Sequence, residues 1–158
     1  MKNKKLLLSI IVGSIVIITA VVLFLLLSKK KITCTMTSDQ KRNGYIIQYS
    51  YVIESKYGYV QSININEVIT SKDSKILDKF ENQFNKQYSY NKNTYHGYQY
   101  TVTNSDGKVE SNITINYKEF DMKKFIKNNE AMKSYTKNNK LTLDGARKMY
   151  ESTGATCK

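Results

Sequence analysis

The chain has 158 residues and a formal net charge of +12, with 25 lysines and arginines against 13 aspartates and glutamates. Six of the basic residues flank an apolar run near the N-terminus, so the charge does not indicate a specific nucleic-acid site. A single histidine and the lack of a glycine-rich phosphate motif argue against a metal site, a bound cofactor and the common catalytic motifs.

The apolar run covers residues 6–27 and contains no charge. As a helix it would span about 33 Å, which is enough to cross the hydrocarbon core of a bilayer. No small-residue cleavage site follows it, so the run is typical of a retained signal anchor. We expect residues 1–31 to form a transmembrane anchor with lysine flanks, and residues 32–158 to form one globular domain.

The only two cysteines, Cys34 and Cys157, lie at opposite ends of this domain. Such a pair is typical of one disulfide, which persists in an oxidising compartment. Two unrelated free thiols in a cytoplasmic domain are the alternative. The lysines on the two sides of the anchor are evenly balanced, so the cysteines decide the orientation. The sequence thus predicts a single-pass protein of the cell membrane, with a cytoplasmic N-terminus and an extracytoplasmic domain.

Hydrophobic periodicity predicts the elements of the domain in chain order. After a short lead over residues 35–42, alternation predicts strands over residues 44–54 and 59–70, joined by a turn at Gly58. The period then changes, and apolar residues three or four apart predict a helix over residues 71–88. These elements form a hairpin followed by a helix.

A second hairpin and two helices follow. Strands are expected over residues 95–103 and 108–118, joined by a turn that ends at Gly107. Asp121 is expected to cap a further helix, and residues 142–152 to form the last one. The sequence therefore predicts an α+β fold: a four-stranded antiparallel sheet in ββαββαα order with its helices on one face, preceded by the N-terminal transmembrane helix.

Several segments of the domain resemble the YehR-like family of small bacterial lipoproteins. These are the tyrosine-rich strand over residues 45–51, the hairpin over residues 98–117 and the closing LTLDGARKMY segment over residues 141–150. The resemblance covers residues 44–154 and implies the fold and an envelope location, because the family has no assigned activity. The chain departs from the family at its N-terminus, since no lipobox cysteine follows the apolar run.

The 13 tyrosines are the most distinctive side chains of the sequence. They alternate along the expected strands, so the first interpretation is an amphipathic core with hydroxyls at its rim. The other interpretation is a flat aromatic platform for a glycan or peptide, for which Tyr95, Tyr98 and Tyr100 are the candidates. His96 has no ligand partner near it in sequence and is interpreted as a structural or surface residue.

The carboxylates are dispersed, without a pair in an apolar context that would suit acid–base catalysis, and Glu67 and Glu110 are expected to face solvent. The leading hypothesis is a membrane-anchored cell-envelope protein without enzymatic activity or cofactor. It would contact the lipid bilayer through its N-terminal helix and bind an envelope protein or a glycan. The alternatives are a cell-wall-associated enzyme or accessory subunit that uses carboxylates, and a subunit of a larger membrane machine.

Overall fold

The computed structural model describes Phe24 and residues 28–158. The strands are β1 (Lys29–Gln40), β2 (Tyr45–Lys56), β3 (Tyr59–Ser71), β4 (Tyr98–Ser105), β5 (Lys108–Asn116), β6 (Thr136–Lys137), β7 (Lys140–Leu141) and β8 (Thr156–Cys157). The helices are α2 (Ser74–Thr94), α3 (Met122–Asn128) and α4 (Leu143–Ser152), with 3₁₀ turns η1 (Lys41–Asn43) and η2 (Glu130–Tyr135).

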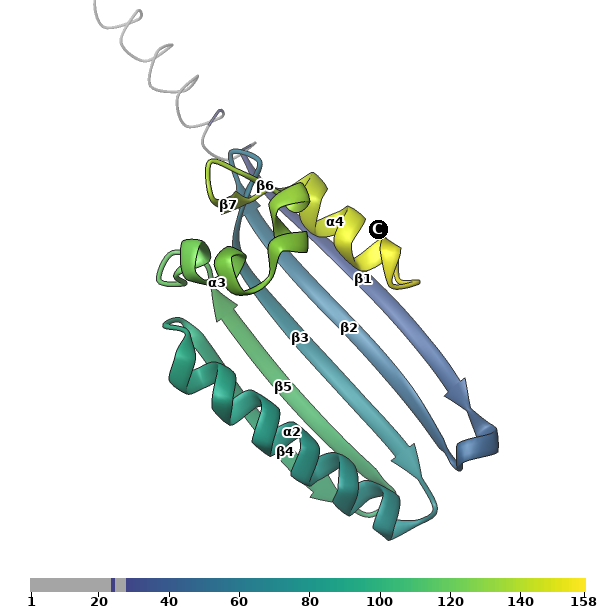
Figure 1. Ribbon diagram of the computed structural model, residues 1–158. Helices are drawn as coiled ribbons and strands as arrows, with labels where there is room; N and C mark the ends of the chain where they lie inside the picture. Colours follow the sequence, from purple (N-terminus) through teal and green to yellow (C-terminus); the bar gives the residue numbers. More distant parts are fainter. Residues whose placement is uncertain (1–23, 25–27) are drawn as a thin grey trace, which may run out of the picture.

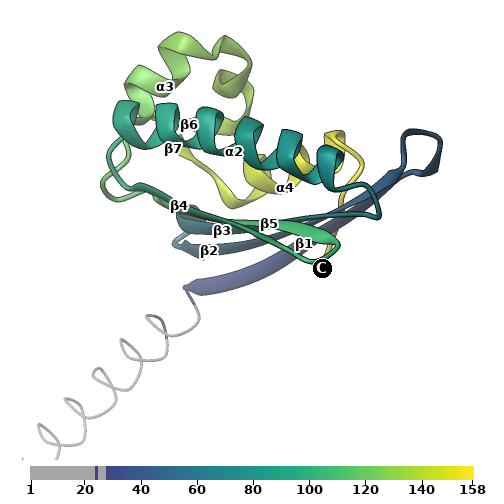
Figure 2. The same ribbon diagram turned by 90° about the horizontal axis from the view of Figure 1, so that it is seen from below.

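One antiparallel sheet of six strands, in the order β4-β5-β3-β2-β1-β8, forms the body of the described chain (Figure 1). A separate two-stranded sheet pairs β6 with β7. Within the described residues, the helices all lie on one face of the large sheet, and no helix covers the other face, which we call the bare face (Figure 2). Along that covered face α2 lies beside β4 and β5, whereas α4 lies toward β1 and β2.

The predicted four-stranded sheet is wrong, because β1 and β8 extend the sheet on one side. β1 pairs with β2 along its whole length, and it includes lysines that the sequence assigned to the flank of an anchor. Its period-two pattern is visible in the sequence: Ile32 and Cys34 are buried, whereas Thr35 is exposed. The neighbouring apolar run and lysine cluster concealed this strand, and two residues of β8 are too few to give a periodic signal.

The predicted transmembrane helix, and the location derived from it, need correction as well. No helix within Phe24 and residues 28–158 is long and apolar enough to cross a membrane. The predicted span, residues 6–27, lies outside the described residues except for Phe24. The single-pass topology and the extracytoplasmic location are therefore not retained.

Local capping and close backbone approach hold the helices over the sheet. Asp73 caps α2 by accepting a hydrogen bond from the backbone N–H of Lys75, and Thr142 caps α4 through the N–H of Gly145. A Cβ at position 145 would lie 2.0 Å from the carbonyl oxygen of Tyr135. Glycine is therefore needed there for α4 to approach the end of η2 this closely.

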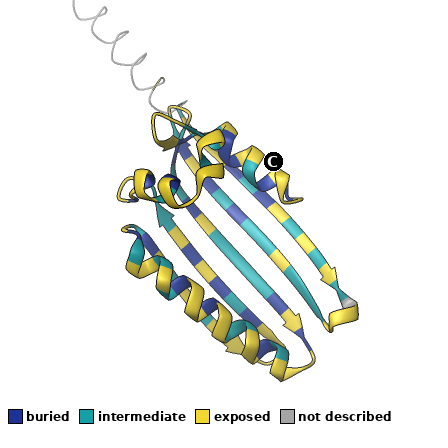
Figure 3. Cartoon of the chain, in the orientation of Figure 1, coloured by how far each residue is buried: buried dark blue, intermediate teal, exposed yellow. Residues whose placement is uncertain are grey.

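The core lies between the sheet and this helix layer, and its burial follows the alternation of the strands (Figure 3). The central strands contribute Ile53, Ile63 and Ile69, which have no exposed surface. The predicted disulfide between Cys34 and Cys157 is present and joins β1 to β8. Because β8 follows α4 directly, the disulfide attaches the C-terminal end of the helix layer to the sheet.

Candidate functional site

A carboxylate lies on the covered face of the sheet, where the sequence expected apolar side chains. On β3 the residues Ile63, Ile65 and Ile69 face the helices, and Glu67 continues the same alternation. Glu67 is directly opposite Tyr49 of β2 and opposite Ser111 of β5. The structure thus corrects the expectation that Glu67 faces solvent, because the side chain is half-buried beneath the helix layer.

Two hydroxyl groups hold one oxygen of this carboxylate. The Tyr88 hydroxyl, from α2, and the Ser111 hydroxyl both donate hydrogen bonds to Oε2 of Glu67, the second over 2.8 Å. Oε1 has no hydrogen-bond partner in the described chain, and no buried side-chain oxygen there lacks a partner, so Oε1 is in contact with solvent. No salt bridge to Glu67 occurs among the described residues.

Tyrosine rings surround the carboxylate on both sides. Tyr49 and Tyr51 of β2 are stacked with ring centroids 6.0 Å apart, and Tyr51 stacks on Tyr150 of α4 at 4.0 Å. On the other side Tyr88 meets Tyr100 of β4 edge to face at 5.8 Å. We refer to Glu67, Tyr49, Tyr51, Tyr88 and Tyr100 as the Glu67–tyrosine cluster.

The charge of Glu67 affects the pKa values of the surrounding tyrosines. Burial raises the pKa of Tyr49, Tyr51 and Tyr88, and the negative charge of Glu67 raises each of them further. Burial also raises the pKa of Tyr98 to about 12. The rings therefore stay neutral at physiological pH, with their hydroxyls protonated and their aromatic faces intact.

The three tyrosines that the sequence proposes as a binding platform do not form a flat surface. Tyr95 and Tyr98 are buried, with 6% and 8% of their surface exposed, and Tyr95 packs between Phe120 and Phe125. Tyr100 is half-buried and belongs to the Glu67–tyrosine cluster. His96 is exposed, and no group of three or more His, Cys, Asp or Glu residues suited to a metal occurs in the part of the chain that the structure describes.

The bare face of the sheet is polar along its central strands. Its side chains on β3 and β5 are mainly asparagine, threonine and serine, and they hydrogen-bond across the strands. The amide nitrogen of Asn66 donates to Asn112 Oδ1 over 2.9 Å, and Thr114 donates to Asn64 Oδ1 over 2.9 Å. Glu110 also lies on this face and accepts from Asn66. The donors and acceptors are thus largely satisfied by one another.

A second group of functional side chains lies at the end of the sheet where β1 begins. A hollow of about 620 Å³ between the β2–β3 turn, the segment after β5 and the β6–β7 turn contains Lys56, Lys118, Lys123 and Lys140 in its walls. Its carboxylate, Asp121, already caps α3 by accepting from the backbone N–H of Lys124. Aromatic rings complete the walls: Tyr57, Tyr59, Tyr117 and Phe120.

An adjoining hollow of about 580 Å³ shares three of these wall residues, Lys56, Gln61 and Lys118. It adds Lys29, Lys30 and Lys31 of β1, together with Glu54. Seven lysines and two carboxylates therefore line the two hollows, which we call the lysine-rich end. Among the described residues, none of these lysines takes part in a salt bridge.

Sequence reasoning missed both groups for identifiable reasons. The alternation of Ile63, Ile65 and Ile69 places Glu67 on the apolar face, and this pattern was the available signal for the cluster. The lysine-rich end has no such signal, because it combines residues from four separate segments that only the strand register brings together.

The Tyr88 hydroxyl contributes to stability through its bond to the carboxylate. Tyr88→Phe removes a charge-assisted hydrogen bond, so we expect the free energy of unfolding to fall by about 1.5–3 kcal/mol. Urea denaturation followed by circular dichroism measures the change. Tyr90→Phe on the same helix is the matched control, since Tyr90 is 65% exposed; an equal loss in both variants would contradict the assigned role of the Tyr88 bond.

Comparisons with known proteins bear on the fold. Neither protein-family models nor curated proteins gave a match to this chain. The NMR structure of the YehR protein of E. coli is similar, with a TM-score of 0.53 and 15% identity, covering 82% of this chain and 91% of that one. An NMR structure of a protein from Streptococcus pneumoniae gave a TM-score of 0.44 and 16% identity, covering 82% and 86%. At such identity the likeness to YehR concerns the fold alone.

Proposed function

We propose that this chain, whose fold is YehR-like as its sequence predicts, is a non-enzymatic binding module that docks a phosphate-bearing polymer on its lysine-rich end. The observation that carries the proposal is the pair of adjoining hollows, which share Lys56 and Lys118 and are lined by seven lysines. Two hollows side by side suit a chain with repeated negative charges better than a single small anion.

Unpaired lysines at this end create a positive potential. Six of the seven are exposed. The walls contain two carboxylates, Asp121, which caps α3, and Glu54, which accepts a hydrogen bond from Ser62. A cluster of one sign over a concave surface concentrates counter-ions and accelerates the association of a charged ligand. A polyanion that binds to the lysine-rich end would therefore displace the small counter-ions held there.

The basic residues of the lysine-rich end are compatible with phosphate groups. No arginine lines either hollow, so the described walls offer point charges instead of the bidentate fork that matches carboxylate and phosphate alike. The ammonium group of lysine acts as a point charge and is a common ligand of phosphate. The rings of Tyr57 and Tyr59 lie beneath the ammonium groups of Lys56 and Lys140, at 5.0 and 5.8 Å, and restrict where those charges point.

Charge reversal at the lysine-rich end tests this function. For the full-length protein with Lys31→Glu and Lys118→Glu, we expect the affinity for polyphosphate to fall at least about tenfold, because two contributing charges change sign. Isothermal titration calorimetry at low and moderate salt measures it, and the wild-type affinity should decrease as salt increases. Polyglutamate should bind the wild type more weakly than polyphosphate does.

Lys72→Glu with Lys86→Glu is the matched control, since it makes the same change in net charge at and before α2, away from both hollows. This variant should keep the wild-type affinity within about threefold. An equal loss in both double variants, or equal binding of polyglutamate and polyphosphate, would contradict a phosphate-specific docking site at this end.

A further inference from the structure

We propose that the Glu67–tyrosine cluster binds an organic ammonium group, carried by a small quaternary amine or by an alkyl primary amine. The site lies on the helix side of the sheet and is separate from the lysine-rich end, so it goes beyond polyanion binding. Its ligand has the opposite charge, and the proposal does not depend on the docking of a polymer.

The negative charge of Glu67 has no cationic partner in the described chain. Both hydroxyl donors, from Tyr88 and Ser111, bond to Oε2, and a neutral glutamine at this position would accept the same two bonds through its amide oxygen. A half-buried charge without a cationic partner is costly, since burial weakens its hydration. The free Oε1 and the unneutralised charge are what a cationic ligand requires.

Aromatic faces supply the second component of such a site. Tyr49 lies directly across the β2–β3 pair from Glu67, and its ring is parallel to that of Tyr51 within 4°. Tyr88 and Tyr100 lie on the side of α2 and β4. A cation is attracted to the face of an aromatic ring, and a set of such rings is the usual receptor for quaternary ammonium groups. The carboxylate and the aromatic rings therefore both attract a cationic ligand.

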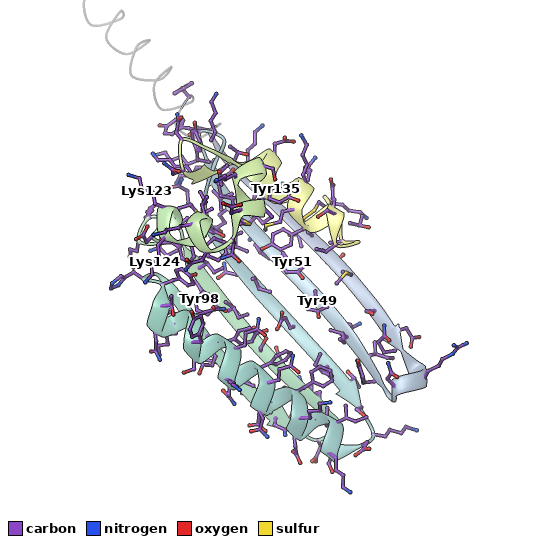
Figure 4. All side chains as sticks on the ribbon, viewed as in Figure 1. Tyr49, Tyr51, Tyr98, Lys123, Lys124 and Tyr135 are labelled. Atoms are coloured by element: carbon purple, nitrogen blue, oxygen red, sulfur yellow. A yellow bond between two sulfur atoms is a disulfide. The ribbon has the colours of Figure 1, made fainter. Side chains whose placement is uncertain are left out.

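The cluster is accessible along the stretch of sheet between α2 and α4. Tyr49, Glu67 and Tyr100 are half-buried instead of fully covered. Figure 4 shows Tyr49 and Tyr51 on β2 in this stretch, with α2 on one side and α4 on the other. Tyr49, Glu67 and Tyr100 therefore leave part of the cluster exposed to solvent on the helix side.

A row of packed aromatic rings runs from the cluster toward a further hollow. This hollow, of about 540 Å³, has Tyr45 of β2 and Phe80 of α2 in its walls, and their rings meet edge to face at 5.0 Å. Along α2 the rings of Phe80, Phe84 and Tyr88 follow one another at centroid distances of 6.0 and 5.3 Å. The row ends at the Tyr88 bond to Glu67. Phe84 and Tyr88 are buried, with 7% and 5% of their surface exposed, so this row is part of the core and the cluster takes the ammonium group alone.

Titration with small cations and a neutral analogue tests the site. Choline, n-butylammonium and the carbon isostere of choline, in which carbon replaces the nitrogen, are added to the full-length protein, and the tyrosine ring resonances are followed by NMR. We expect at least one of the two cations to bind about tenfold or more tightly than the isostere, since the charge supplies the attraction. Tighter binding of choline identifies a quaternary headgroup as the source, and tighter binding of n-butylammonium identifies a lysine-like amine.

Matched variants distinguish the contribution of the Glu67 charge to cation binding from that of the aromatic rings. Glu67→Gln keeps the two hydroxyl bonds and should weaken cation binding about tenfold, whereas Glu110→Gln, on the bare face, should leave it unchanged. Tyr49→Leu should weaken it about threefold to tenfold and serves as the second variant if Glu67→Gln does not fold. Equal binding of cation and isostere, or equal effects of Glu67→Gln and Glu110→Gln, would overturn the proposal.

Discussion

Replacement of both Cys34 and Cys157 by alanine is expected to lower the free energy of unfolding by about 4–5 kcal/mol. The disulfide closes a loop with a sequence separation of 123, and the chain-entropy model gives a stabilisation of this size for a loop of about that length. A domain of this size is typically stable by about 5–15 kcal/mol, so the loss removes a large part of the total. Urea denaturation monitored by circular dichroism measures it.

The location of the disulfide explains why other contacts do not replace it. β8 has two residues, and outside them the C-terminal end is held by the backbone hydrogen bonds between Thr33 and Lys158, each 2.9 Å long. Reduction of the wild-type protein should give the same loss as the double alanine variant, whereas Thr156→Ala, an exposed neighbour in β8, should have little effect. A wild-type stability that does not change on reduction would contradict the entropic argument.

The extent to which the sequence predicts this fold depends on how local each signal is. The strands that became β2 to β5 and the helix that became α2 have clear periodicity over eight or more residues, and their turns carry glycines with positive φ at Gly58 and Gly107. β1 has the same alternation, but its lysines and the apolar run before it favoured a membrane flank. The pairing of Cys34 with Cys157 follows from there being two cysteines.

The candidate sites are less predictable, because they depend on register. Tyr98 and Tyr100 both face the helices, yet Tyr98 is buried beneath them and Tyr100 is half-buried in the Glu67–tyrosine cluster. Alternation gives the face of a residue but not what covers that face. Likewise, Lys118 follows β5 and Lys31 lies near the start of β1, and the antiparallel register places both at the same end of the sheet, where they line one hollow.

Titration to alkaline pH is expected to unfold the protein steeply above pH 10. Burial raises the pKa of six tyrosines above the ordinary value of 10.0, to about 12 for Tyr98; the others are Tyr49, Tyr51, Tyr88, Tyr117 and Tyr150. Below pH 10 both states keep these protons and the stability is fully present. Above it the unfolded chain loses them while the folded protein retains them, so the equilibrium moves toward unfolding until the folded pKa is passed.

The steepness follows from the number of buried phenols. Each contributes a loss of about 1.4 kcal/mol per pH unit, so six give roughly 8 kcal/mol per unit. A stability of about 5–15 kcal/mol then disappears within about one to two pH units. Circular dichroism and phenolate absorbance should therefore change together. Tyr51→Phe with Tyr150→Phe should reduce the slope by about a third and raise the midpoint, because two of the six groups are removed and neither hydroxyl makes a hydrogen bond in the described chain. Tyr90→Phe, at an exposed ring, should leave the midpoint unchanged. Phenolate formation at all six rings in a protein that stays folded would contradict their burial.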